Sequence, residues 1–326
     1  MPIIATRGLT MRFPGVTALD DLTLDVEPGI VGLVGANGAG KSTLIKILLG
    51  LQPASAGQAR VLDLDVTRQG ELIRERVGYM PEYDCLPPDV SATEFVVHMA
   101  RMSGLPPTAA RERAADTLRH VGLYEERYRP IGGYSTGMRQ KVKLAQALVH
   151  DPRLVFLDEP TNGLDPAGRD EMLELIRRIG AEFGISVLVT SHLLGELERT
   201  CDHIVIIDGG RLLRSQAVEA FTTDSGTLVV EVEEGRDALG RALAGAGLTV
   251  RPEGRALLVE VAGERTFDLI RDAVVELDLL LIRMERRRHH IEEVFATPAA
   301  PGAAGVPPQG VQAPPGAVVP PRGYQG

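Results

Sequence analysis

The segment 35–43 constrains the fold of this chain more than any other. It reads Gly-Ala-Asn-Gly-Ala-Gly-Lys-Ser-Thr and fits G-x-x-x-x-G-K-[ST], the pattern of a phosphate-binding loop. The apolar run at residues 29–34 precedes it and predicts a buried strand, and the apolar segment 43–49 predicts a helix after it. Strand, glycine loop and helix in this order are the context that the motif needs, so we expect a nucleotide site here. A glycine-rich turn without a ligand is the alternative, and these flanks disfavour it.

The chemistry of such a loop is local. Glycines let backbone N–H groups turn inward on the phosphates, and the following helix N-terminus adds partial positive charge. Lys41 is expected to reach the phosphates, and the Ser42 hydroxyl to bind Mg²⁺. The predicted nucleotide-binding residues of the loop are Gly35, Ala36, Asn37, Gly38, Ala39, Gly40, Lys41, Ser42 and Thr43.

Paired acids follow a second apolar run. Residues 154–157 read Leu-Val-Phe-Leu and are followed by Asp158 and Glu159. This pattern predicts a buried parallel strand that delivers carboxylates to its C-terminal end, where ligands bind in α/β sheets. Asp158 is expected to hold Mg²⁺, and Glu159 to polarise a water. The alternative is an acid pair that caps a helix.

His192 follows a third apolar run, residues 186–190, which predicts another buried strand. A single histidine after a strand is commonly structural. Its expected position at the same sheet edge as Glu159 makes a functional role equally open.

Composition limits the class of protein. The length of 326 residues fits two domains better than one, and the net charge of −9 argues against general nucleic-acid binding, so no nucleic-acid partner is expected. Cys85 and Cys201 are the two cysteines, and they indicate free thiols in a reducing compartment. The chain has neither an apolar run long enough to span a membrane nor a signal-peptide pattern, which favours a cytoplasmic protein.

Between the loop and the acid pair the pattern becomes helical. Ser91 and Glu94 form a capping-box signature for a helix over 91–103, and further helices are predicted over 108–121 and from 135 to about 150. Before the loop, residues 3–27 predict two antiparallel strands with Phe13 between them, which on its own indicates a partly exposed core aromatic.

The C-terminal third has a different organisation. A hairpin over 203–213 and a helix and linker over 214–225 lead into a β-α-β-β-α-β pattern that suggests a small ferredoxin-like unit. A short helix is predicted at 291–295. The segment 298–326 is rich in Pro, Gly and Ala, has Arg322 as its single charged residue and is expected to be disordered.

Three further motifs complete a family pattern. Tyr134-Ser135-Thr136-Gly137-Met138 is similar to a signature loop, residues 162–165 to a D-loop and residues 190–192 to an H-loop. In order and spacing over about residues 3–215, the chain resembles the ATP-binding subunit of an ABC transporter. The resemblance implies an α/β P-loop ABC ATPase with an antiparallel β subdomain and an inserted helical subdomain at about 83–150. The expected domains are 1–215 for the ATPase, 226–297 for an accessory α+β domain and 298–326 for the tail.

The resemblance also implies roles. Family members form head-to-tail dimers that sandwich two ATP molecules, so Ser135 and Gly137 of one subunit would contact the γ-phosphate held by the other. Asp165 would communicate across that interface. Glu159 would be the general base and His192 would contact the γ-phosphate. Phe13 would become the platform for adenine.

Two departures indicate a branch of the family. Glu82 stands where most members have the glutamine of the Q-loop; it can still bind Mg²⁺ or water but adds negative charge. The signature loop has Thr136 and Met138 where Gly and Gln are usual. Both variants look like the branch that works with ABC-2-type membrane proteins, largely exporters. We therefore expect an ATPase that uses ATP and Mg²⁺ and powers a separate ABC-2-type permease from the inner face of the membrane. A soluble ABC-type nucleotide-dependent regulator without a transport role remains the alternative, and the cargo is open.

Overall fold

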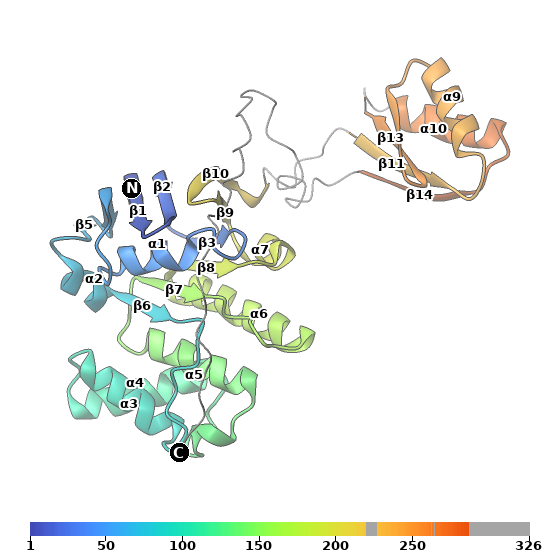
Figure 1. Ribbon diagram of the computed structural model, residues 1–326. Coiled ribbons are helices and arrows are strands. Elements are labelled where there is room, and N and C mark those ends of the chain that lie inside the picture. Colours follow the sequence, from blue (N-terminus) through green and yellow to red (C-terminus); the bar gives the residue numbers. More distant parts are fainter. Residues whose placement is uncertain (220–226, 262, 264, 287–326) are drawn as a thin grey trace, which may run out of the picture. The chain divides into compact units, whose positions relative to one another are not determined.

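A computed structural model describes residues 1–219, 227–261, 263 and 265–286, and its elements are drawn in Figure 1. The predicted helix at 291–295 and the predicted tail at 298–326 lie outside the described residues. The domain boundaries remain predictions. Among the described residues no helix combines the length and hydropathy needed to cross a bilayer.

The central sheet of the N-terminal part carries the site. Its order is β10-β9-β3-β8-β7-β6, and all neighbours are parallel except the edge pair β10 and β9. Every residue of β3, β7 and β8 is buried, which explains the apolar runs 30–34, 154–157 and 187–189 within them. The strands are β3 (Ile30–Val34), β6 (Val77–Met80), β7 (Leu154–Asp158), β8 (Ser186–Ser191), β9 (His203–Asp208) and β10 (Arg211–Ala217).

A second sheet is antiparallel, as predicted. It has the order β2-β1-β4-β5, with β1 (Ile4–Phe13), β2 (Val16–Val26), β4 (Ala56–Val61) and β5 (Leu64–Asp65). One hydrophobic core joins it to the central sheet through α1 (Lys41–Leu48), the helix that follows the glycine loop. Core members from the three layers include Leu9, Leu22, Leu44, Ile45 and Phe156.

The predicted helical block is present. After the short α2 (Gly70–Arg76) it contains α3 (Ala92–Met102), α4 (Pro107–His120), the 3-10 turn η1 (Ile131–Gly133) and α5 (Thr136–Leu148). The Ser91 hydroxyl accepts the Glu94 N–H at 3.2 Å and the Glu94 carboxylate accepts the Ser91 N–H at 2.8 Å, which confirms the capping box. At Gly78 a Cβ atom would lie 2.0 Å from the Ala147 carbonyl oxygen, so α5 packs closely on β6.

Two helices follow the central strands. In α6 (Pro166–Phe183), Asp165 is the N-cap and accepts the Gly168 N–H at 3.3 Å, as the Asp-Pro sequence predicts. Gly184 ends this helix in the left-handed conformation, with φ of 63°. The shorter α7 (Leu194–Thr200) follows β8.

The prediction that a helix begins at residue 214 is wrong. Strand β10 continues to Ala217, which pairs with His203 of β9. This part of β10 is the polar run Arg214, Ser215 and Gln216, which lies at the edge of the sheet. An edge strand is exposed along one side, so its sequence does not need the alternating apolar residues by which a strand is predicted.

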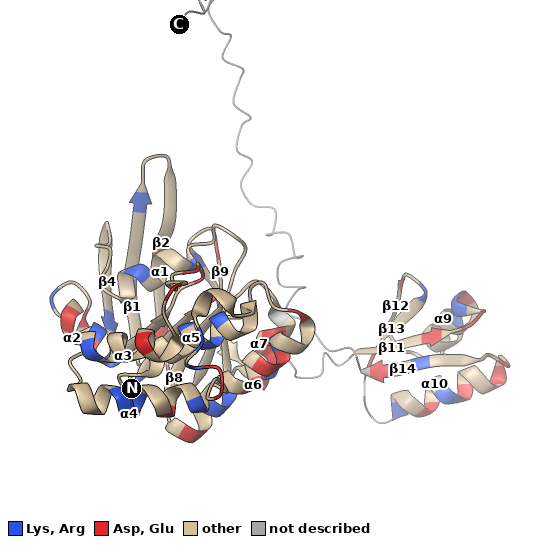
Figure 2. Ribbon diagram, turned by 90° about the horizontal axis from the view of Figure 1, so that it is seen from below, with Lys and Arg blue, Asp and Glu red and all other residues tan. Residues whose placement is uncertain are grey.

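The described residues of the C-terminal part form the predicted β-α-β-β-α-β order. The elements are β11 (Thr227–Val232), α9 (Arg236–Gly245), β12 (Val250–Glu253), β13 (Ala256–Glu260), α10 (Arg265–Glu276) and β14 (Leu281–Arg286). The sheet order β12-β13-β11-β14 is antiparallel throughout and encloses a core of its own around Leu228, Val230 and Ile270. On the exposed face of α10, Arg271 pairs with Asp268 and Asp272, so charges of both signs alternate there (Figure 2).

Candidate active site

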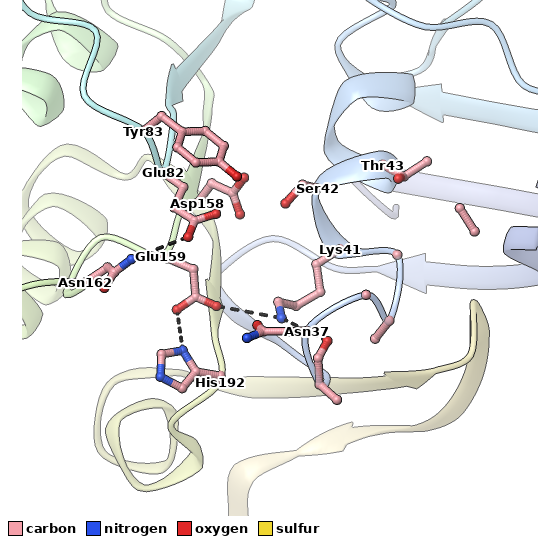
Figure 3. Close-up of a pocket in the computed structure, with 15 residues that line it drawn as sticks. Asn37, Lys41, Ser42, Thr43, Glu82, Tyr83, Asp158, Glu159, Asn162 and His192 are labelled. Atoms are coloured by element: carbon pink, nitrogen blue, oxygen red, sulfur yellow. Dashed lines mark hydrogen bonds and ion pairs between the residues drawn. The ribbon is translucent and has the colours of Figure 1, made fainter. Parts of the chain in front are cut away.

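A polar cavity of about 520 Å³ lies at the carboxyl ends of β3, β7 and β8 (Figure 3). It brings together the glycine loop, Glu82, both predicted acids and His192, which are far apart in the sequence. Its lining residues are Ala18, Ala36, Asn37, Gly38, Ala39, Gly40, Lys41, Ser42, Thr43, Glu82, Tyr83, Asp158, Glu159, Asn162 and His192. The sheet edge therefore gathers the predicted groups as expected for parallel strands.

At two positions of the loop only glycine fits, because the backbone of another segment lies too close for a side chain. Gly40 has φ of 102°, and a Cβ atom there would lie 2.3 Å from the Ala18 carbonyl oxygen. At Gly35 a Cβ atom would lie 2.6 Å from the Ile207 carbonyl oxygen. Gly40 is also the N-cap of α1 and supplies no side-chain acceptor, so the first amides of α1 keep their donors available. This arrangement is a ready anion site.

Lys41 joins the loop to the acid pair. Its side chain is 7% exposed, and the ammonium donates to the Gly35 carbonyl oxygen at 2.7 Å. The same Nζ lies 3.7 Å from Glu159 Oε1. A buried ammonium thus faces both the loop that would hold phosphate and a carboxylate across the cavity.

Glu159 is held in an uncommon backbone conformation. Its φ of 50° is left-handed, which costs a non-glycine residue about 1–3 kcal/mol. The Glu159 N–H donates to Thr190 Oγ1 at 2.9 Å, and that hydroxyl donates to Asp158 Oδ1 at 2.8 Å. One buried hydroxyl of β8 therefore fixes both acids at the end of β7.

Each oxygen of Glu159 faces a different partner. His192 Nδ1 lies 2.9 Å from Oε2, while Lys41 faces Oε1. The Glu159 side chain is 7% exposed whereas that of His192 is 50% exposed, so the histidine forms the solvent side of the pair. Figure 3 shows the two side chains pointing toward one another, with Lys41 on the far side of the carboxylate.

Glu82 is bonded to the helical block as well as to the cavity. Its carbonyl oxygen accepts a bond from Lys143 Nζ at 2.9 Å, and its Oε1 accepts one from Asn162 Nδ2 at 3.4 Å. Burial lowers the pKa of Lys143, and nearby acids, Glu82 among them, oppose that shift. Tyr79, on β6, has its pKa raised to about 12 by burial first and then by the charge of Asp158. The backbone of Glu82 is therefore held by the buried ammonium of Lys143, and its carboxylate by the Asn162 amide.

Three oxygen donors suit a hard divalent cation. Ser42, Glu82 and Asp158 line one cavity, and hydroxyl and carboxylate oxygens are the ligands that Mg²⁺ prefers. Within the described part of the chain, no cluster of three His, Cys, Asp or Glu side chains could hold a metal alone. The donor set thus fits a cation that completes its shell with phosphate oxygens and water.

Four predicted residues lie away from this cavity. Phe13 ends β1 and is 41% exposed, and it does not contribute to the cavity wall. Ser135 caps α5 by accepting the Met138 N–H at 3.3 Å. Gly137 and Asp165 do not line the cavity either. Gly137 lies beside the segment that precedes Asp165, since a Cβ atom at Gly137 would lie 3.8 Å from the Leu164 side chain. The signature segment therefore lies beside residues 163–164, and of the 162–165 segment Asn162 lines the cavity of the same subunit.

Some residues that line or support the cavity were not predicted from the sequence. Tyr83 and Asn162 line the cavity beside predicted residues, so their neighbours along the chain were a usable signal. Ala18 comes from β2 and carried no signal, because its role depends on how the two sheets pack. Thr190 was part of a recognised motif but not identified as the residue that fixes the acids.

Comparisons with known proteins all find ATP-binding proteins of ABC transporters. The protein-family model described as "ABC transporter" matches residues 19–162. The chain is 37% identical over 240 residues to the daunorubicin/doxorubicin resistance ATP-binding protein DrrA of Streptomyces peucetius, covering 73% of this chain and 72% of that protein. It is 36% identical over 233 residues to the Nod factor export ATP-binding protein I of Ralstonia nicotianae, covering 71% and 72%. Among solved structures, cbiO1 from Clostridium perfringens, part of the ABC transporter complex cbiONQ, superposes with a TM-score of 0.62 at 26% identity, covering 67% of this chain and 90% of that one.

Proposed function

This chain belongs to the family of ABC transporter ATP-binding proteins, and we propose that the cavity beside Lys41 is the site at which it hydrolyses ATP to drive transport. The fold is that of an ABC ATPase, and the protein is the ATPase subunit of a membrane transporter. The observation that carries the site assignment is the buried Glu159, whose two oxygens face Lys41 and His192 in the wall of the phosphate-loop cavity.

Nucleotide binding follows from the loop. The amides of residues 36–43 and the N-terminus of α1 receive the phosphates, and Lys41 turns from Glu159 to them. That exchange leaves Glu159 Oε1 without its cation, so the carboxylate becomes able to accept a proton as the phosphates arrive. Phe13, at the exposed end of β1, offers a face on which adenine stacks.

Hydrolysis needs a base and an orienting group. Glu159 accepts the proton of the attacking water, and His192 holds the carboxylate through Oε2 and contacts the γ-phosphate. Ser42, Asp158 and Glu82 would hold Mg²⁺, which supplies charge neutralisation at the phosphates. Thr190 keeps Asp158 and Glu159 at fixed positions during the step.

In this proposal the cavity of one subunit does not by itself supply all the contacts to the γ-phosphate. Ser135, Gly137 and Asp165 belong to a surface away from the cavity of their own subunit. We propose that two copies associate head to tail, so that Ser135 and Gly137 of one copy complete the site of the other. The N-terminus of α5, capped by Ser135, would then face the γ-phosphate.

A separate ABC-2-type permease is the proposed partner, and transport is outward. Two relatives are named for drug resistance and for export. The helical block is the proposed contact, because Lys143 and Glu82 bond it to the cavity and nucleotide state can therefore move it. The protein would act from the cytoplasm, on the inner face of the membrane.

Fractionation tests this partner. The protein expressed alone should remain in the soluble fraction and should move to membranes when a candidate permease is co-expressed. Arg101→Glu, on the exposed side of α3, should weaken that recruitment while ATP binding persists. Arg68→Glu is also a charge reversal at an exposed position, lies outside the helical block and serves as the control. Tight binding to protein-free liposomes, or recruitment unaffected by any permease, would overturn the proposal.

A further inference from the structure

A buried carboxylate outside the cavity lies beside both loops that carry the proposed hydrolytic residues. Glu196 belongs to α7, is 7% exposed and does not line the cavity. Its Oε2 accepts a hydrogen bond from Thr161 Oγ1 at 2.8 Å, and Ser191 Oγ lies 3.4 Å from the same oxygen. Thr161 is 4% exposed and Ser191 is 2% exposed, so both contacts are shielded from water.

These contacts tie two loops together. Thr161 follows Glu159 by two residues, after β7, and Ser191 directly precedes His192, at the end of β8. Glu196 therefore bonds the backbone segment that carries the base to the segment that carries its histidine partner. The strained φ of Glu159 needs such support, because left-handed backbone persists only where surrounding contacts fix it.

The same carboxylate reaches a third segment through Arg169 of α6. Arg169 Nε donates to the Leu164 carbonyl oxygen at 3.1 Å, and its NH1 lies 3.9 Å from Glu196 Oε1. Leu164 directly precedes Asp165, which is proposed to face the second subunit. Glu196 thus stands where the segments bearing Glu159, His192 and Asp165 meet.

We propose that Glu196 is a positioning residue for hydrolysis, which holds Glu159 and His192 in register through Thr161 and Ser191. The inference rests on the proposed function, since it gives Glu196 a role only through those two residues. A charged acceptor makes stronger hydrogen bonds than a neutral one, so the charge of Glu196 matters as well as its shape. Small displacements of reacting groups slow the chemical step far more than they weaken ground-state binding.

Steady-state ATPase kinetics of variants test this role. Glu196→Gln keeps the size of the side chain and removes its charge, and Thr161→Val removes the donor to Glu196 Oε2 at nearly constant volume. We expect each to lower kcat by about tenfold with KM for ATP changed by less than about twofold. The double variant should be no slower than the slower single variant, because Glu196→Gln weakens and Thr161→Val removes the same hydrogen bond.

The matched control is Glu198→Gln, which removes the same charge from the same helix two residues away. It should leave kcat unchanged. If Glu196→Gln does not fold, Thr161→Val decides alone. Unchanged kcat in Thr161→Val and Glu196→Gln, or losses that multiply in the double variant, would overturn the inference. So would a fall in melting temperature accompanied by equal changes in kcat and KM, because that pattern describes a purely structural role.

Glu159→Gln, measured in the same assay, separates the two proposals. If it abolishes turnover while the Glu196 and Thr161 variants remain normal, the proposed site stands and only the positioning role fails. If it retains turnover, the assignment of Glu159 fails first, and with it the role that Glu196 takes from it.

Discussion

His192 Nδ1 lies 2.9 Å from Glu159 Oε2, although the two residues follow different strands and are far apart in the sequence. The sheet explains the contact. Strands β7 and β8 are parallel neighbours, and Asp158 stands opposite Thr190 in their register. The residues that follow the two strands therefore emerge at the same height on the same edge, so the histidine meets the carboxylate.

Replacing His192 tests the importance of this contact. In His192→Ala, Glu159 Oε2 loses its partner and the carboxylate is free to rotate away from the cavity. We expect kcat for ATP to fall by roughly tenfold to a hundredfold, as loss of an orienting group implies. ATP binding should change little, because the loop and Lys41 are intact. His98→Ala, an exposed histidine on α3, is the control and should behave as the natural chain. Equal turnover in both variants would exclude His192 from hydrolysis.

The glycine loop makes a second prediction about binding. Gly40→Ala places a methyl group 2.3 Å from the Ala18 carbonyl oxygen, at a φ that alanine rarely adopts. The loop must shift, so we expect the affinity for a fluorescent ATP analogue to fall by roughly tenfold or more. Gly184→Ala is the matched control, because φ is also positive there but a methyl group meets nothing within 4 Å. It should cost about 1 kcal/mol of stability and leave nucleotide affinity unchanged. Full affinity in Gly40→Ala would contradict the geometry of the loop.

Tyr79 predicts a pH dependence of stability. Burial and the charge of Asp158 raise the pKa of its phenol to about 12 in the folded protein, against about 10 in the unfolded chain. The unfolded state therefore loses this proton first, and the contribution of Tyr79 to stability, complete below pH 10, is lost as the pH rises from 10 to 12. In Tyr79→Phe this component is absent. Urea unfolding at pH 9.5 and 11.5 should show a smaller loss for the variant, and an equal or larger loss would argue against the shift.

Much of the site could be predicted because most of its functional residues lie in short, continuous motifs of the sequence. The glycine loop, the acid pair after an apolar strand and the histidine after another each report a strand end, and a parallel sheet gathers such ends. The capping box at Ser91 was readable for a similar reason, since its two partners are three residues apart.

What could not be predicted depends on contacts between distant segments. The roles of Thr190 and Glu196 arise only when β7, β8 and α7 are packed together, because neither residue differs in type from an ordinary polar side chain. The hairpin over 203–213 included the start of β10, but the continuation of this strand to Ala217 was not predicted, because its polar residues lie on a sheet edge. The adenine contact of Phe13 stays a prediction, since that residue is separate from the cavity wall.

The most direct test of the account is the ATPase rate of Glu159→Gln, measured together with ATP binding. The amide keeps the size and hydrogen bonding of the side chain but cannot accept the proton of the attacking water. We expect turnover to fall by roughly a hundredfold or more, as loss of a general base implies, while ATP still binds and dimers accumulate. Turnover near that of the natural chain, with ATP binding intact, would contradict the assignment of Glu159 as the base.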